Sequence, residues 1–168
     1  MRNLVFVLLL VLSLGICSAQ TTSTKPVEPA AIGVIFRLDP STQGFKPLPN
    51  EQWKAKGKAG WTTATGFLIV SGESSTFRIK AGESTEFVFI LGNPESVSIY
   101  RFDQKKNERQ FEMVKLRSNG RERENIPGIP TDLTKYGDTS YKLVPKSPLT
   151  PGEYAIEFGN KVFTFGID

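Results

Sequence analysis

"LTPGEYAIEFGNKVFTFGID", residues 149–168, is the stretch of sequence that decides the fold. It predicts two strands joined by the two-residue turn Gly159-Asn160, because such a turn needs the positive φ angles that Gly and Asn tolerate best. The turn determines the register, since it places Phe158 opposite Lys161. The next pairs on the aromatic side are then Ile156 with Phe163 and Tyr154 with Phe165.

The same pattern assigns the faces of this hairpin. Paired residues of an antiparallel ladder point to one side of a sheet, so one face collects large apolar side chains. These are Tyr154, Ile156, Phe163 and Phe165. A slip of one residue would expose the whole set, so the pattern specifies its own register. Pro148 and Pro151 cannot donate to a ladder and mark the loop before the first strand.

Short strand patterns recur along the rest of the chain, separated by turn signals about every ten residues. In "AAIGVIFRLDP" (30–40) the apolar residues Ile32, Val34, Phe36 and Leu38 alternate, which is typical of a strand. "TEFVFIL" (85–91) is apolar on both faces, which predicts a central, covered strand. The sequence therefore predicts an all-β fold, an antiparallel two-sheet β-sandwich of the immunoglobulin-like type with about eight or nine short strands.

Three segments carry less regular patterns. "NEQWKAKGKAG" (50–60) is expected to hold one helical turn after Asn50, the only helix expected in the chain. Residues 96–102 and 109–116 are expected to pair as a hairpin around the charged tip 103–108. The polar stretch 117–140 is rich in Pro, Gly and Asn, so we expect irregular structure over most of its length.

The first nineteen residues have the pattern of a signal peptide. Arg2 supplies a positive start, an apolar run follows, and Cys17 to Ala19 form a small-residue cleavage site. We therefore expect a signal peptide over 1–19, a Thr/Pro-rich linker over 20–30 and a single β-sandwich domain over 31–168. As an alternative, Cys17 could anchor a lipid, although Ile16 stands where such processing prefers a small residue.

This pattern predicts an exported bacterial protein of the periplasm or cell exterior, with no transmembrane segment after signal removal. Cleavage would remove the only cysteine, so the domain would be stabilised without disulfides. The net charge is +4, or +3 without Arg2. Because this excess is small, we expect no nucleic-acid partner.

Two segments carry a resemblance to a known class. "FRIKAGESTEFVF" (77–89) resembles the strand–turn–strand step of bacterial exported immunoglobulin-like domains. The ending, "PGEYAI" with "FTFGID", is similar to the terminal hairpins of exported sandwich proteins without an assigned function. The resemblance covers about a third of the expected domain and implies a fold rather than an activity.

The composition excludes several chemistries. The chain has no histidine, which removes histidine bases, histidine metal ligands and Ser-His-Asp triads. Without a cysteine in the expected mature chain, thiol catalysis and thiolate zinc sites are also absent. We therefore expect no enzyme activity, no catalytic residues, no metal and no cofactor. One alternative, a glycan hydrolase that uses paired carboxylates, stays open.

The binding candidates are basic and aromatic. Lys105, Lys106 and Arg109 crowd the tip of the expected hairpin, and Arg117, Arg121 and Arg123 follow it. If the hairpin forms, these are two patches at opposite ends of one strand, both diluted by glutamates. Trp53 is a further candidate for an exposed contact, whereas Trp61 is expected at the edge of the core.

These observations favour a non-enzymatic binding module of the cell envelope or exterior. Its loops would contact another envelope or surface protein, or an acidic polymer. Besides the carboxylate hydrolase, one further alternative is an assembly subunit that exchanges strands, with 85–91 as an edge in need of a partner.

Overall fold

The computed structural model describes residues 25–117 and 123–168. The expected signal peptide, Cys17, the first part of the linker and Arg121 lie outside these residues. The described chain confirms the all-β prediction: it has fifteen strands in three sheets, no α-helix and one 3-10 turn, η1 (Pro94–Ser96). The expected two sheets and eight or nine strands were an underestimate, because several strands are only two or three residues long.

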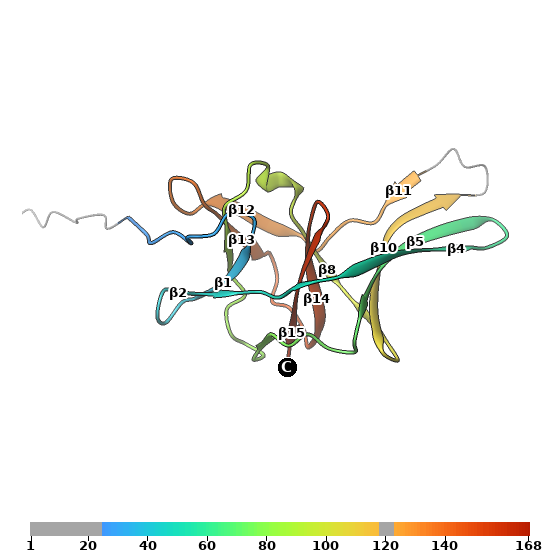
Figure 1. Cartoon of the computed structure of the whole chain (residues 1–168), viewed down its shortest axis with the longest axis horizontal. Helices are drawn as coiled ribbons and strands as arrows, with labels where there is room; N and C mark the ends of the chain where they lie inside the picture. Colours follow the sequence, from blue (N-terminus) through green and yellow to red (C-terminus); the bar gives the residue numbers. More distant parts are fainter. Residues whose placement is uncertain (1–24, 118–122) are drawn as a thin grey trace, which may run out of the picture.

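The outer sheet has the strand order β12-β13-β7-β1-β2 and lies at one end of the molecule (Figure 1). Its strands are β1 (Ile35–Asp39), β2 (Gly44–Pro47), β7 (Phe87–Phe89), β12 (Thr131–Lys135) and β13 (Tyr141–Pro145). β7 pairs with β1 on one side and β13 on the other, which confirms that 85–91 contains a central strand. The strand-exchange alternative assumed an unpaired edge here, and that assumption is wrong.

The central sheet has the order β3-β15-β14-β8. Its strands are β3 (Asn50–Glu51), β8 (Ser98–Arg101), β14 (Gly152–Phe158) and β15 (Lys161–Ile167), and β6 (Arg78–Ile79) pairs in parallel with β15. β14 and β15 form the predicted hairpin: Phe158 lies opposite Lys161 and Tyr154 opposite Phe165. Gly159 in the turn has a φ of 60°, as the turn requires.

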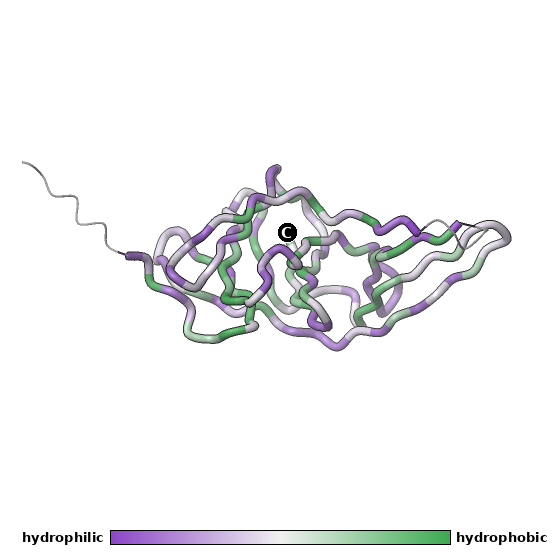
Figure 2. Tube along the Cα trace, turned by 90° about the horizontal axis from the view of Figure 1, so that it is seen from above, coloured by the Kyte–Doolittle hydropathy of each residue, from purple (hydrophilic) through white to green (hydrophobic). Residues whose placement is uncertain are grey.

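The wing sheet has the order β11-β10-β5-β4, with β9 paired to β10. Its strands are β4 (Trp53–Ala59), β5 (Thr63–Ser71), β9 (Asp103–Lys105), β10 (Glu108–Arg117) and β11 (Arg123–Asn125). A β-bulge between Glu112 and Val114 disrupts the ladder of β10, and bulges bend strands. Beyond it the β4–β5 hairpin projects away from the rest of the chain (Figures 1 and 2).

The central sheet is buried on both faces. Ile156, Phe163 and Phe165 contribute to a core shared with Ile35 and Phe87 of the outer sheet. On the opposite face, Ala155 and Val162 pack in a second core with Leu68, Phe102 and Phe111. The three sheets are thus layered around two cores, and the C-terminal hairpin belongs to both. Each fully buried Phe or Ile contributes about 1.5–3 kcal/mol to this packing.

Two local predictions were wrong. Residues 50–60 form β3 and β4 rather than a helical turn. Residues 98–101 pair with β14 in the central sheet, so the hairpin around Lys106 consists of β9 and β10 alone. In both cases long-range pairing, which local composition does not reveal, decides the structure. The stretch 117–140, expected to be irregular over most of its length, contains the short strands β11 and β12 among its described residues.

Candidate binding surface

One face of the wing sheet carries a row of lysines. In β4, "WKAKGKA", the lysines alternate with small residues, so Lys54, Lys56 and Lys58 point to the same side. They lie opposite Ile69, Phe67 and Thr65 of β5. All three lysines are exposed. The alternation of charged and small residues has no apolar period that would indicate a strand, and the helical turn expected here depended on Asn50 as a cap.

Two further lysines from another part of the chain join this row. A groove of about 680 Å³ is lined by Lys56, Lys58, Lys105 and Lys106, together with the aromatic ring of Phe67. Its remaining lining residues are Gly57, Glu108 and Gln110. Lys105 and Lys106 come from the end of β9 and its turn to β10. We call Lys54, Lys56, Lys58, Lys105 and Lys106 the lysine face.

The lysine face has an excess of positive charge, because Glu108, opposite Lys105, is the one carboxylate among the lining residues of the groove. No Asp or Glu occurs between Glu51 and Glu73, a span that includes all of β4 and β5. Within residues 25–117 and 123–168, no ion pair or hydrogen bond engages any of the five ammonium groups. By contrast, Arg37, Arg78 and Arg109 each bind a carboxylate. Lysines on an edge strand such as β4 also discourage edge-to-edge association, but Lys105 and Lys106 converge on the groove from a different hairpin.

The two tryptophans exchange the roles expected for them. Trp61 lies at the end of the β4–β5 hairpin and is 101% exposed, so its expected place at the edge of the core was wrong. Trp53 is half-buried against the second core, and its Nε1 donates a hydrogen bond of 2.9 Å to the carbonyl oxygen of Asn160. Trp53 therefore anchors the wing sheet to the C-terminal hairpin, and the free aromatic ring belongs to Trp61.

Arg109 does not lie on the surface where the sequence suggested. It is 1% exposed and is held between the wing and central sheets. Its Nη2 donates to Glu51 Oε2 at 2.6 Å, and its Nη1 lies 3.5 Å from Glu153 Oε2. Its Nε donates to the carbonyl oxygen of Gly72 at 3.1 Å. Arg109 shares a strand face with the buried Phe111, and this two-residue spacing was a signal that it points inward.

A second arginine completes this buried network. Arg78 binds the other oxygen of Glu153 and donates from Nε to Asp168 Oδ1 at 2.9 Å. The hydrogen bond with Asp168, followed by the contact with Glu153, raises the pKa of the Arg78 guanidinium. Gly166 lies under this contact, and a Cβ there would collide with the guanidinium. The network therefore joins β3, β6, β10, β14 and the C-terminus.

The same network brings two carboxylates, Glu51 and Glu153, to one guanidinium. Glu51 and Glu153 both bind Arg109, and Glu153 is also bound by Arg78 and by the backbone N–H of Ser75 at 2.7 Å. Glu153 is 3% exposed. Because cations and donors saturate both carboxylates, neither is available as a general acid or as a nucleophile on a substrate. The pair gives the carboxylate-hydrolase hypothesis no support.

The remaining candidates lie at the far end of the wing. Arg117 pairs across from Thr63, on the same side of the sheet as Lys58. Arg123 pairs across from Leu116 and lines a cleft with Ala55, Gly66 and Val114 that shares Lys56, Gly57 and Phe67 with the groove. Arg121 lies outside the described residues. Of the second expected patch, Arg117 thus lies on the side of the β4 lysines, which sequence reasoning did not select.

Clusters of metal-ligand side chains and membrane-spanning helices are absent from the described residues. Residues 25–117 and 123–168 contain no group of three or more side chains with the ligand types that hold a metal ion. The same residues contain no helix with the length and apolar character needed to cross a bilayer.

Comparison with known proteins finds no relative of this chain. No protein-family model matches the chain, and no curated protein or solved structure is detectably similar to it.

Proposed function

We propose that this protein is a non-enzymatic binding module of the cell envelope or exterior, and that its lysine face binds an acidic glycan. The observation that carries the proposal is the groove in which Lys56 and Lys58 of one hairpin meet Lys105 and Lys106 of another. Four ammonium groups outnumber the single carboxylate of Glu108 around this groove, and an anionic partner relieves the repulsion that remains.

The chemistry of the groove favours a polymer over a compact anion. Lysines are point charges on flexible stems, so they match irregularly spaced carboxylates without the bidentate geometry that arginine requires. Phe67 and the lysine stems offer apolar surface beside the charges, against which a sugar ring can pack. The exposed indole of Trp61 extends this surface along the hairpin.

The scaffold is consistent with this role. The second core and the ion network around Arg109 attach the wing sheet to the central sheet. All lining residues of the groove except Lys106, which lies in the turn from β9 to β10, belong to strands. A sandwich-type, immunoglobulin-like relationship and export to the periplasm or exterior remain parts of the proposal. The absence of histidine from the sequence supports a binding role over catalysis.

The experiment measures binding to polygalacturonate, a polymer of sugar acids, with dextran as the neutral polymer. The double variants K56A/K58A and K105A/K106A each remove two charges from the groove. K135A/K146A is the matched control, since it removes two exposed lysines from the outer sheet and its neighbouring loop. Each exposed charge contact is worth about 0.5–1 kcal/mol, so each groove variant should bind roughly tenfold more weakly.

The control variant should bind as the parent does, and dextran should not bind. Affinity should also fall as salt rises, because exposed charges are screened. Equal losses in all three variants would mean that only net charge matters, and unchanged binding in the groove variants would refute the proposal.

A further inference from the structure

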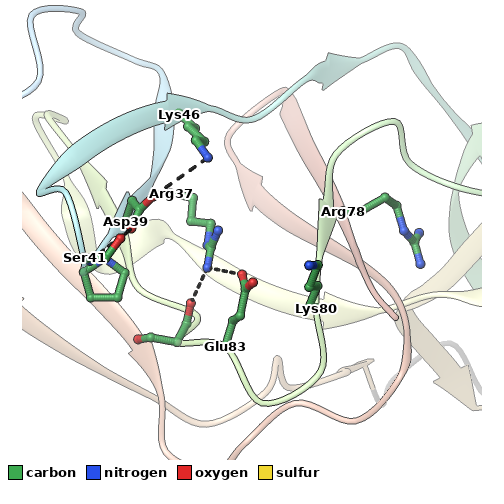
Figure 3. A pocket seen from close by; sticks show the side chains of 9 residues that line it. Arg37, Asp39, Ser41, Lys46, Arg78, Lys80 and Glu83 are labelled. Atoms are coloured by element: carbon green, nitrogen blue, oxygen red, sulfur yellow. Dashed lines mark hydrogen bonds and ion pairs between the residues drawn. The ribbon is translucent and has the colours of Figure 1, made fainter.

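A second cleft, remote from the lysine face, lies where the outer and central sheets separate. It has a volume of about 470 Å³ and is bordered by β1, β2 and the segment that follows β6 (Figure 3). This volume is in the range of small-molecule sites. Its charged lining residues are Arg37, Asp39, Lys46, Arg78, Lys80 and Glu83.

Arg37 is the buried element of this cleft. It occupies the core-facing row of β1, two residues after the fully buried Ile35 and opposite Phe87 of β7. Its side chain is 9% exposed. A guanidinium so far removed from water requires acceptors for its N–H groups, because an unsatisfied buried donor destabilises the fold.

The protein satisfies only part of this requirement. Arg37 Nη2 donates to Glu83 Oε2 at 2.7 Å and to the carbonyl oxygen of Ser84 at 3.3 Å (Figure 3). Arg37 Nε is buried and has no partner; it is the single unsatisfied buried side-chain donor found in residues 25–117 and 123–168. Nε itself is too deeply buried for a ligand to reach, but Nη1 of the same guanidinium is not buried and donates no hydrogen bond within the described residues. An under-satisfied guanidinium that lines a cleft points to an acceptor that the chain itself does not provide.

The nearby carboxylate of Asp39 is already engaged. Its Oδ1 accepts hydrogen bonds from Ser41 Oγ at 2.6 Å and from the Ser41 backbone N–H at 3.0 Å, and these bonds lower the pKa of Asp39. Lys46 Nζ lies 3.9 Å from the other oxygen. The Asp39 carboxylate is thus ionised and occupied by hydrogen bonds within its own turn.

One cation of the cleft is left for an anion. Arg78 binds Glu153 and Asp168. Arg37 pairs with Glu83, and Lys46 lies near Asp39. Lys80 is the remaining lining cation. Lys80 is exposed at the rim, and no ion pair holds its ammonium group among the described residues.

We propose that this cleft binds the oxyanion of a sugar-sized molecule, a carboxylate or a phosphate, with Arg37 as the buried anchor. The oxyanion accepts a hydrogen bond from Arg37 Nη1, Lys80 supplies the second positive contact at the rim, and the remainder of the molecule fills the cleft. This cleft differs from the lysine face in its position and in the type of ligand. The cleft holds one anionic group, whereas the lysine face binds along a polymer.

The test follows the Nε–H resonance of Arg37 by NMR during titration with galacturonate, with glucose 6-phosphate and with neutral galactose. A saturable shift with an anionic sugar and none with galactose is the expected result, and the comparison of the two anions identifies which oxyanion is preferred. K80A should weaken binding roughly fivefold. K58A, on the lysine face, should leave it unchanged.

No shift with either anionic sugar overturns the proposal, and so does an equal shift with galactose. Affinity that K80A leaves intact also overturns it. R37Q is a second variant: if it folds, it should abolish binding of the anionic sugar. If it does not fold, the Nε–H titration of the parent and the K80A result decide. Loss of polygalacturonate binding in K56A/K58A has no bearing on this site, so the two proposals fail separately.

Discussion

Arg109 Nη1 of the wing sheet lies 3.5 Å from Glu153 Oε2 of the central sheet, and the side chains are 1% and 3% exposed. This ion pair is fully desolvated and joins strands 44 residues apart in sequence. Glu51, Gly72 and Ser71 provide the other acceptors for the guanidinium, whose Cζ lies 5.3 Å from the centroid of the Phe102 ring. The wing that carries the lysine face is therefore attached to the core by a buried charge.

Removing Arg109 should destabilise the fold strongly. R109M leaves Glu51 and Glu153 with one cation fewer in a buried site, and breaking a buried pair typically costs about 3–5 kcal/mol. We expect a loss of about 3 kcal/mol in the free energy of unfolding, since Arg78 still binds Glu153. Urea denaturation measures it. K105A, an exposed lysine nearby, should change stability by less than about 0.5 kcal/mol, and equal stability of the two variants would contradict the network.

Substitution of Trp53 should lower stability, whereas substitution of Trp61 should weaken binding. W53F removes the hydrogen bond to Asn160 and should lower the free energy of unfolding by about 1 kcal/mol. W61A should leave stability unchanged because the ring is exposed, while its affinity for polygalacturonate falls roughly threefold with the loss of apolar contact. Denaturation and binding measured on both variants check this, and a destabilised W61A would show that Trp61 is packed.

Glu157 should make stability depend on pH in a defined direction. Burial raises the pKa of this carboxyl above its ordinary value, so the folded state holds the proton more tightly than the unfolded state. Ionised Glu157 therefore opposes folding at neutral pH, and this cost disappears as the pH falls below the ordinary pKa. E157Q should be slightly more stable than the parent at pH 7 and equal to it at acid pH, as thermal denaturation at both pH values can show. If E157Q were less stable than the parent at pH 7, the claim that ionised Glu157 opposes folding would be contradicted.

Glu28 should have an unusually acidic carboxyl. A hydrogen bond from Ser140 Oγ at 2.7 Å, with one from the Thr139 backbone N–H at 2.9 Å, lowers the pKa of Glu28 from 4.5 to about 2. The contact is thus complete above the ordinary value and is lost as the pH falls through about 2. NMR titration of the Glu28 carboxyl measures this directly.

Gly137 provides the matched test of that contact. A Cβ at this position would collide with the Glu28 carboxylate, so G137A should displace it and return its pKa towards the ordinary value. G92A is the control, because nothing lies within 4 Å of a Cβ there. An unchanged pKa in G137A would mean that the expected linker does not dock on Thr139 and Ser140.

Local pattern was sufficient where the interaction itself was local. The turn Gly159-Asn160 and the alternation around it predicted the register of β14 and β15. The burial of the opposite face was not predictable, because Ala155 and Val162 pack against strands of another sheet. For β4, a row of lysines and small residues has no apolar period, and pairing with β5 decides the structure.

The two buried arginines show a limit of a different kind. Arg37 follows Ile35 by two residues and Arg109 precedes Phe111 by two, so each continues an inward row of its strand. That spacing was visible, but a charged residue is read as exposed unless its partner is known. The partners Glu83 and Glu153 are distant in sequence and become neighbours only through the sheet topology.

The most direct test of the account is the mapping of polygalacturonate onto the protein by NMR at low salt. Signals of the lysine face and the Trp61 indole should shift in proportion to the bound polymer, and the shifts should vanish at high salt. Signals of β12 and β13, two strands of the outer sheet that do not line the Arg37 cleft, should stay in place. Shifts confined to the outer sheet, or none at low salt, would contradict the claim that the lysine face is the binding surface.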